Sequence, residues 1–228
     1  MKKYLVGLVI LSLVFGFAFT SFAQDYSEAP MLAELVKQGK LPPVEERLPA
    51  KPFVVGPGVL ISEEDLPDWE VGKYGGTLRT AHSVADWAPD VFVMGNEPLL
   101  CAPGIGVKGI KGNIVEDFEV EDNRIFTFKF REGLKWSDGE PVTTEDIRFT
   151  YEDVLLNEKI TPVFPAKFRA GGRADGEPTK LEVLDEYTFT MSFEEPYGGF
   201  LREITVKGWS GYTDLLKPAH YLKQFHAE

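Results

Sequence analysis

The sequence predicts an α+β fold, in which two antiparallel hairpins and one packed helix form a unit over residues 110–200. In the first hairpin, 115–120 and 125–131 flank the polar turn 121–124, and phenylalanine occupies every second position in the middle of the later strand. The run 187–193 repeats this alternation of large apolar and smaller or polar side chains. A period of two is typical of a strand that buries one face.

The helix between the hairpins has a clear start and one apolar side. Thr143 and Asp146, three residues later, form the sequence pattern of a capping box. Apolar side chains recur at helical spacing from Ile147 to Leu155, and we expect the helix to end near Asn157. Hairpins and a helix that each have one apolar face bury those faces against one another, which gives the α+β class.

The two hairpins align without a gap. Phe118–Phe130 and Leu181–Phe193 share six of 13 residues: Glu, Val, Asp, Phe, Thr and Phe. Two copies are too few for a repeat architecture that stacks identical units. We favour convergent hairpin patterning over duplication, which remains the alternative interpretation.

The composition is globular, with a marked acidic balance. Against 24 Lys and Arg stand 36 Asp and Glu, so the formal net charge of the 228 residues is −12. Nucleic acids and anionic membrane surfaces need clustered basic side chains, so we expect binding to neither. The single cysteine, Cys101, excludes a disulfide framework and a multi-cysteine zinc site, and we expect it to be a buried, inert thiol.

No metal or organic cofactor is expected. His82, His220 and His226 are widely spaced and lack a metal-ligand motif. The run Gly104–Gly109 matches G-x-G-x-x-G, but no helical period follows it, and the dinucleotide mechanism needs a helix N-terminus at that place. We interpret the run as a flexible glycine loop.

Residues 1–23 have the features of a signal peptide. Lys2 and Lys3 precede the apolar run 4–19, and Ser21-Phe22-Ala23 supplies a small–x–small cleavage site. We therefore place cleavage after Ala23, which leaves Gln24 as the mature N-terminus. The run is shorter than the roughly 20 residues that span a bilayer, and no basic cluster or cysteine follows the site. We expect a soluble, periplasmic or extracellular product without a membrane anchor.

The rest of the chain divides by its composition. Residues 24–73 should hold a helix at 27–38, with Ser27 as its N-cap, and a proline-rich arm. Residues 74–109 should begin with a strand at 75–81. The last segment, 201–228, is expected to contain a helix, a strand near 204–206 and a final helix opened by Pro218.

Two kinds of side chain are candidates for chemistry or binding. Two carboxylates at a set distance can hydrolyse glycosides, so the adjacent acidic pairs of this sequence leave a secreted hydrolase as an alternative function. Most of these acidic residues, however, fall on expected solvent faces or helix caps. Trp87, and Trp209 with Tyr212 in a glycine-flanked loop, are candidates for stacking on a sugar ring or a peptide side chain, against the equal alternative of packing on the core. The acidic pairs are Glu116-Asp117, Glu145-Asp146, Glu152-Asp153 and Glu194-Glu195.

Three motifs together carry a family resemblance. They are Asn113–Val120 (NIVEDFEV), Phe126–Pro141 (FTFKFREGLKWSDGEP) and Thr144–Ile147 (TEDI). In these the chain resembles the family 5 extracellular solute-binding proteins, the receptors of peptide, nickel and oligosaccharide ABC importers. The resemblance extends over essentially the whole mature chain.

The resemblance implies a two-lobed clamp of the periplasmic-binding-protein type II-like class. Residues 74–109 would begin lobe one, 110–200 would be its inserted hairpin subdomain, and 201–228 would return to lobe one. The second lobe is missing from these residues, so we expect a truncated product or a partial sequence. One lobe of a clamp offers only one wall of the ligand cleft, so we do not expect these residues to bind ligand without the second lobe.

The function implied is that of a non-enzymatic binding component. It would capture oligopeptides or oligosaccharides outside the cytoplasmic membrane and deliver them to permease subunits. A remnant that binds nothing is a further alternative. If the family geometry holds, two loops face the cleft and contribute ligand-binding residues: His82, Ser83, Asp86, Trp87, Trp209 and Tyr212.

Overall fold

The protein was analysed as a computed structural model, which describes residues 26–79, 81, 97–104, 108–205 and 214–226. The predicted signal peptide and its cleavage site, Ala23–Gln24, lie outside these residues. In the described part of the chain, no helix combines the length and the apolar character that crossing a membrane requires.

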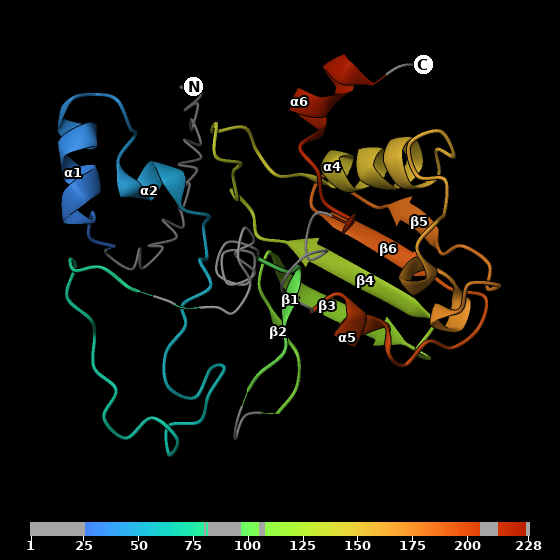
Figure 1. Cartoon of the computed structure of the whole chain (residues 1–228), viewed down its shortest axis with the longest axis horizontal. Coiled ribbons are helices and arrows are strands. Elements are labelled where there is room, and N and C mark those ends of the chain that lie inside the picture. Colours follow the sequence, from blue (N-terminus) through green and yellow to red (C-terminus); the bar gives the residue numbers. More distant parts are fainter. Residues whose placement is uncertain (1–25, 80, 82–96, 105–107, 206–213, 227–228) are drawn as a thin grey trace, which may run out of the picture.

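The main sheet has four antiparallel strands in the order β3-β4-β6-β5 (Figure 1). Both predicted hairpins are confirmed, and their second strands pair with each other at the centre of the sheet. Asp122 and Asn123 turn the first hairpin with φ values of 51° and 53°, the left-handed region that short polar side chains tolerate. The strands are β3 (Val115–Glu121), β4 (Ile125–Phe130), β5 (Lys180–Val183) and β6 (Thr188–Ser192).

The sheet has an approximate two-fold symmetry that matches the hairpin alignment. Thr127 and Thr190 are equivalent in that alignment, and they face each other across β4 and β6 with hydroxyl oxygens 3.3 Å apart. The pairing of Phe118 with Phe128 is repeated by Leu181 with Met191. The shared Glu, Val and Thr residues of the strands, and Phe126 with Phe189, therefore occupy equivalent positions in the sheet.

An aromatic core covers one face of this sheet. Phe126 and Phe128 of β4 and Phe189 of β6 are at most 1% exposed, as alternation predicts. Phe200 of the short helix α5 (Phe200–Glu203) lies at the centre of the core, with its ring centroid 4.9 Å from that of Phe126 and 4.8 Å from that of Phe193. Burial of each such ring contributes roughly 1.5–3 kcal/mol.

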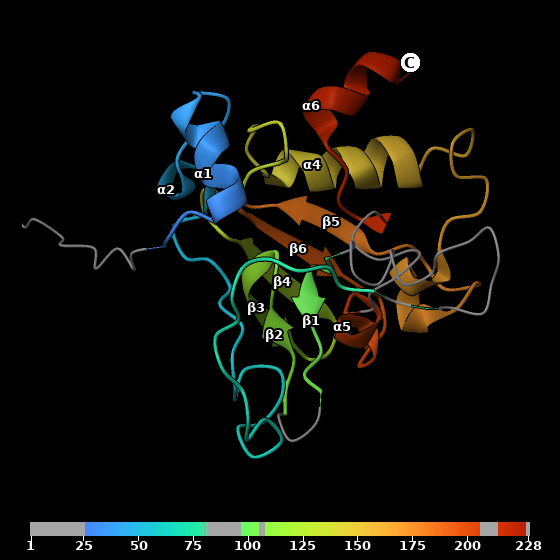
Figure 2. The same cartoon turned by 60° about the vertical axis from the view of Figure 1, so that its left-hand side comes forward.

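The predicted central helix is confirmed, including its capping box. Helix α4 (Thr144–Arg148) continues directly as a π-helix over Phe149–Leu155, beside β5 in Figure 2. Ile147 and Tyr151 bury their side chains in the core. The wider π turn was not predicted, because apolar spacing alone does not distinguish it from an α-turn.

The N-terminal arm departs from prediction at its helices. Helix α1 (Pro30–Lys37) begins later than expected, with Ala29 rather than Ser27 as N-cap, because Pro30 has the fixed φ and absent N–H that suit the first helical position. A second helix, α2 (Val44–Arg47), forms within the proline-rich arm, where little regular structure was expected.

Two predicted strands are wrong for the residues described. Residues 75–79 are exposed and unpaired with any described strand, and Gly75 and Gly76 have φ values of 126° and 76°, which interrupt an extended run. Ile204 and Thr205 extend the turn after α5 instead of forming a strand, since the Ile204 amide donates to the Phe200 carbonyl at 3.3 Å.

The remaining elements are short. Strands β1 (Leu100–Cys101) and β2 (Lys111–Gly112) form a separate antiparallel pair, and Cys101 is buried as predicted. Helix α6 (Ala219–Leu222) follows Pro218 as its N-cap, also as predicted. Three 3-10 turns are formed by Ala166–Phe168, Ala170–Gly172 and Lys223–Phe225.

Candidate functional site

The residues predicted to bind ligand lie outside the described part of the structure, so their roles stay predictions. They are His82, Ser83, Asp86, Trp87, Trp209 and Tyr212. The chain that flanks the second of these loops is firmly held. Thr205 before it is buried, Leu215 and Leu216 after it are each 2% exposed, and Asp214 forms an ion pair with Lys167.

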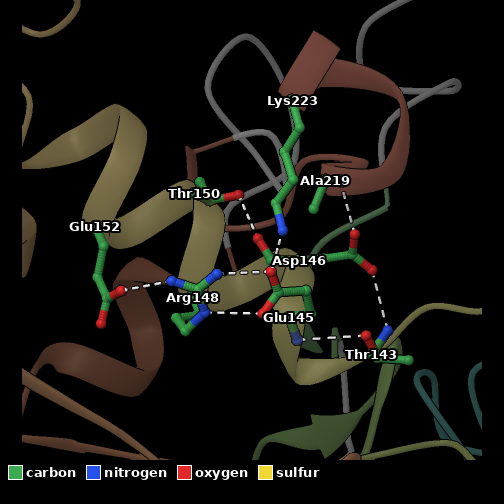
Figure 3. Close-up of polar contacts among 8 residues, drawn as sticks. All are labelled: Thr143, Glu145, Asp146, Arg148, Thr150, Glu152, Ala219 and Lys223. Carbon is green, nitrogen blue, oxygen red and sulfur yellow. Dashed lines mark hydrogen bonds and ion pairs between the residues drawn. The ribbon is translucent and has the colours of Figure 1, made fainter. Parts of the chain in front are cut away.

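Asp146, in the third family motif, joins Trp136 of the second motif to the C-terminal segment, and Figure 3 shows its contacts with Thr143 and Ala219. Its carboxylate is 3% exposed, and one oxygen accepts from the Thr143 amide at 3.0 Å and from the Trp136 indole Nε1 at 3.1 Å. The other oxygen accepts from the Ala219 amide at 2.8 Å. A buried carboxylate that satisfies three donors fixes the relative positions of the segments that carry them.

Thr150 provides a second attachment one turn further along the helix. Its hydroxyl donates to the Asp146 carbonyl at 2.6 Å and accepts from the Lys217 amide at 2.9 Å. Thr150 has no exposed surface, so its hydroxyl needs these partners. Asp146 and Thr150 together fix residues 217–219, directly before α6.

The Asp146 carboxylate therefore has a structural role at the start of α4. Trp136, in the Trp136–Gly139 turn, is anchored by Asp146, which also completes the capping box with Thr143. A carboxylate that accepts three hydrogen bonds is poorly placed to act as a catalytic nucleophile.

Glu145 points away from Asp146 and forms an ion-pair network with Arg148 and Lys223. Its two oxygens accept from Arg148 Nη2 at 2.6 Å and Nε at 2.8 Å, and Lys223 also donates to it. Arg148 reaches Glu152 at 2.8 Å on the next turn. The Arg148 hydrogen bonds, assisted by Lys223, lower the pKa of Glu145 from 4.5 to about 2 despite its partial burial.

The ion-pair network of Glu145, Arg148 and Lys223 should make the stability of the fold depend on pH in the acid range. Because the folded-state pKa of Glu145 is depressed, its contribution is fully present above about pH 4.5 and is lost as the pH falls towards 2. We expect Glu145→Gln to flatten the loss of stability in that window, measured by urea unfolding at successive pH values. Glu34→Gln, which changes an exposed i,i+3 pair on α1, is the control. An unchanged acid limb in Glu145→Gln would contradict the assignment.

Helix α6 is also attached to the Trp136 turn. His220 Nε2 lies 2.8 Å from Asp138 Oδ2, and this hydrogen bond, together with the Glu140 amide, lowers the pKa of Asp138. His226 Nε2 lies 2.9 Å from the Asp153 carbonyl. Neither histidine has the surroundings of a metal ligand, and the described residues contain no group of three or more potential ligands.

Arg131 fastens the N-terminal arm to the sheet. Its side chain is 8% exposed, and it donates to the carbonyls of Asn113 and, at 2.7 Å, of Lys51. Its guanidinium also lies 5.5 Å from the centre of the Phe53 ring. Burial lowers the pKa of Arg131, although the group keeps its charge at neutral pH.

The surface of the described residues includes hollows of about 310 to 490 Å³. One of about 450 Å³ lies between the arm and the Trp136 turn, one of about 310 Å³ lies beside Trp136, Ile114 and Leu216, and one of about 490 Å³ lies at the strand ends near Arg124 and Lys180. Trp136 lines the first two of these hollows.

Sequence reasoning missed Arg131 and Thr150. Both lie in runs that were interpreted by their apolar pattern, and neither residue type signals a buried role by itself. Each acidic pair has at least one member in an ion pair within the described structure. These contacts are Glu116 with Lys51, Glu145 and Glu152 with Arg148, and Glu195 with Arg173.

This chain is similar to known solute-binding proteins. Residues 109–221 match the model of the bacterial extracellular solute-binding proteins, family 5 middle region. The chain is similar to the periplasmic alpha-galactoside-binding protein of Rhizobium meliloti (strain 1021), with 31% identity over 192 residues, which cover 76% of this chain and 26% of that protein.

Two solved structures share the fold over 89% of this chain. An oligopeptide-binding protein OppA matches with a TM-score of 0.67 and 37% identity, over 28% of its own length. The periplasmic binding protein MelB of Agrobacterium fabrum C58, in complex with stachyose, matches with a TM-score of 0.65 and 27% identity, over 31% of its length. The 228 residues thus span less than a third of each of these relatives, and the fold is that of part of a periplasmic-binding-protein type II-like clamp. This chain belongs to the bacterial extracellular solute-binding proteins of family 5.

Proposed function

We propose that this chain is part of the substrate-binding component of an ABC importer, and that its ligand is an oligosaccharide. The observation that carries the proposal is the similarity to an alpha-galactoside-binding protein and to the stachyose complex of MelB, each over most of this chain. The protein is exported by the signal peptide at 1–23 and delivers its ligand to permease subunits.

The ligand is held by the two loops singled out in the sequence. Trp87 and Trp209 stack on sugar rings, and His82, Ser83, Asp86 and Tyr212 supply polar contacts at the edges of the rings. The firmly held flanks of the second loop, from α5 and residues 214–219, support this role, because a loop that starts and ends at fixed points loses less entropy on binding.

Isothermal titration of the native protein, purified at its natural length, tests the proposal. We expect saturable binding of stachyose, and a loss of about tenfold or more in affinity for Trp87→Ala and Trp209→Ala, as for aromatic anchors in other interfaces. Trp69→Ala is the matched control, because Trp69 lies on the arm with 49% of its surface exposed. Unchanged affinity in both loop variants would refute the assignment of the loops.

An oligopeptide is the second candidate ligand, favoured by the similarity to OppA at 37% identity. Titration with short peptides under the same conditions separates the two classes. The protein acts without chemical turnover, and the structural contacts of the acidic pairs support this view. A chromogenic glycoside should therefore stay intact, and hydrolysis abolished by one carboxylate substitution would favour the hydrolase alternative.

A further inference from the structure

The hollow of about 450 Å³ between the arm and the Trp136 turn has the size and lining of a small-ligand site. We call it the arm groove. One wall comes from residues 40–47 of the arm and the other from 135–139. The walls are joined where Lys135 donates to the Glu46 carbonyl, and Arg131 holds the arm next to them. The groove is therefore a fixed feature of the fold.

The aromatic side chain of the groove is held in place. Trp136 Nε1 donates to Asp146, whose carboxylate is itself fixed by the Thr143 and Ala219 amides. A ring that is already ordered loses little further conformational freedom when a ligand stacks on it. Trp136 is half-buried, so part of its surface is accessible.

The polar groups of the groove suit a neutral ligand. It contains three cations and two carboxylates, but Arg47 pairs with Glu28 and Lys135 is bonded to the arm. Among the described residues, the Lys40 ammonium and the Ser137 hydroxyl have no hydrogen-bond partner, which leaves both available. Lys135 keeps its charge when it donates to a carbonyl, so the charges of Lys40 and Lys135 balance those of Glu46 and Asp138. A phosphate or an acidic peptide would need a clear excess of free cations.

We propose that the arm groove binds one pyranose ring of a neutral oligosaccharide. The ring stacks on Trp136, and its hydroxyls bond to Lys40, Ser137 and the Asp138 carboxylate. The groove lies between elements that do not include the predicted ligand loops, so it is a second sugar site with its own residues.

Titration of the native protein with stachyose, followed by calorimetry and saturation-transfer NMR, tests the proposal. We expect two classes of site. Lys40→Met and Ser137→Ala should each weaken the second class about fivefold, the effect of one hydrogen bond, and leave the first class unchanged. Lys37→Met is the matched control, since Lys37 lies on the same arm but outside the groove and pairs with Glu34. Trp136→Phe should remove the second class altogether.

Lys40→Met and Ser137→Ala change exposed side chains on the two walls of the groove, so these two variants test the proposal even if the Trp136 variant unfolds. A single class of site that is insensitive to Lys40→Met and Ser137→Ala overturns the proposal. Equal weakening by Lys37→Met also overturns it. If that single class is lost in the Trp87 and Trp209 variants, the proposed function stands while the arm groove proposal fails.

Discussion

Replacing Asp146 by alanine is expected to lower the free energy of unfolding by about 3–5 kcal/mol. The substitution leaves the Thr143 amide, the Ala219 amide and the Trp136 indole N–H without their acceptor inside the protein. A buried donor without a partner costs about 1–3 kcal/mol, and water entering the space recovers part of the sum. Asp146→Asn should cost less, because the amide keeps one accepting oxygen.

Urea unfolding measures this loss, and hydrogen exchange locates it. Exchange should accelerate at the Ala219 amide, which bonds to Asp146, before it does in β4 and β6. Glu152→Ala on the same helix is the control, since an ion pair that is about half exposed contributes less than about 1 kcal/mol. Similar losses for the two variants would show that Asp146 does not hold the segments together.

Replacing Phe200 by alanine is expected to cost about 3–5 kcal/mol as well, for a different reason. Its ring has no exposed surface and lies within 6.4 Å, between centroids, of the rings of Phe126, Phe128 and Phe168. Removing it leaves a cavity in the middle of the aromatic core. It also frees the four-residue helix α5, which has no other buried side chain.

Thermal or urea unfolding of a graded series tests this second prediction. Phe200→Leu keeps much of the volume and should lose less than Phe200→Ala. Phe225→Ala is the matched control, because that ring is 66% exposed and contacts Tyr221 at the surface. If Phe200→Ala loses no more than Phe225→Ala, the core is not organised around α5.

The predictions that succeeded rest on local chemistry. Alternating phenylalanines require one buried face whichever partner covers it, so the strands at Ile125–Phe130 and Thr188–Ser192 were foreseeable. The capping box at Thr143 uses groups only three residues apart, and it forms as predicted. The predicted strands at 75–81 and 204–206 lacked this support, because an extended segment becomes a strand only when another strand pairs with it.

The candidate sites needed contacts between distant parts of the chain. Lys40 and Ser137 reach one groove only because Arg131 and Lys135 bind the arm, and nothing in the sequence near these residues indicates that contact. The same holds for Thr150, whose partner is the backbone of Lys217, 67 positions later.

The sequence by itself determined the α+β class, the two hairpins, the capped helix and the family resemblance, since each depends on residue patterns along the chain and not on contacts between distant segments. Only the tertiary structure decided that the hairpins join through β4 and β6 with two-fold symmetry. It alone showed that Asp146 is a buried acceptor for Trp136 and Ala219, and that the arm closes a groove over Trp136. Burial and hydrogen bonding between distant segments set these features, because the hydrophobic effect selects which faces meet without regard to their separation along the chain.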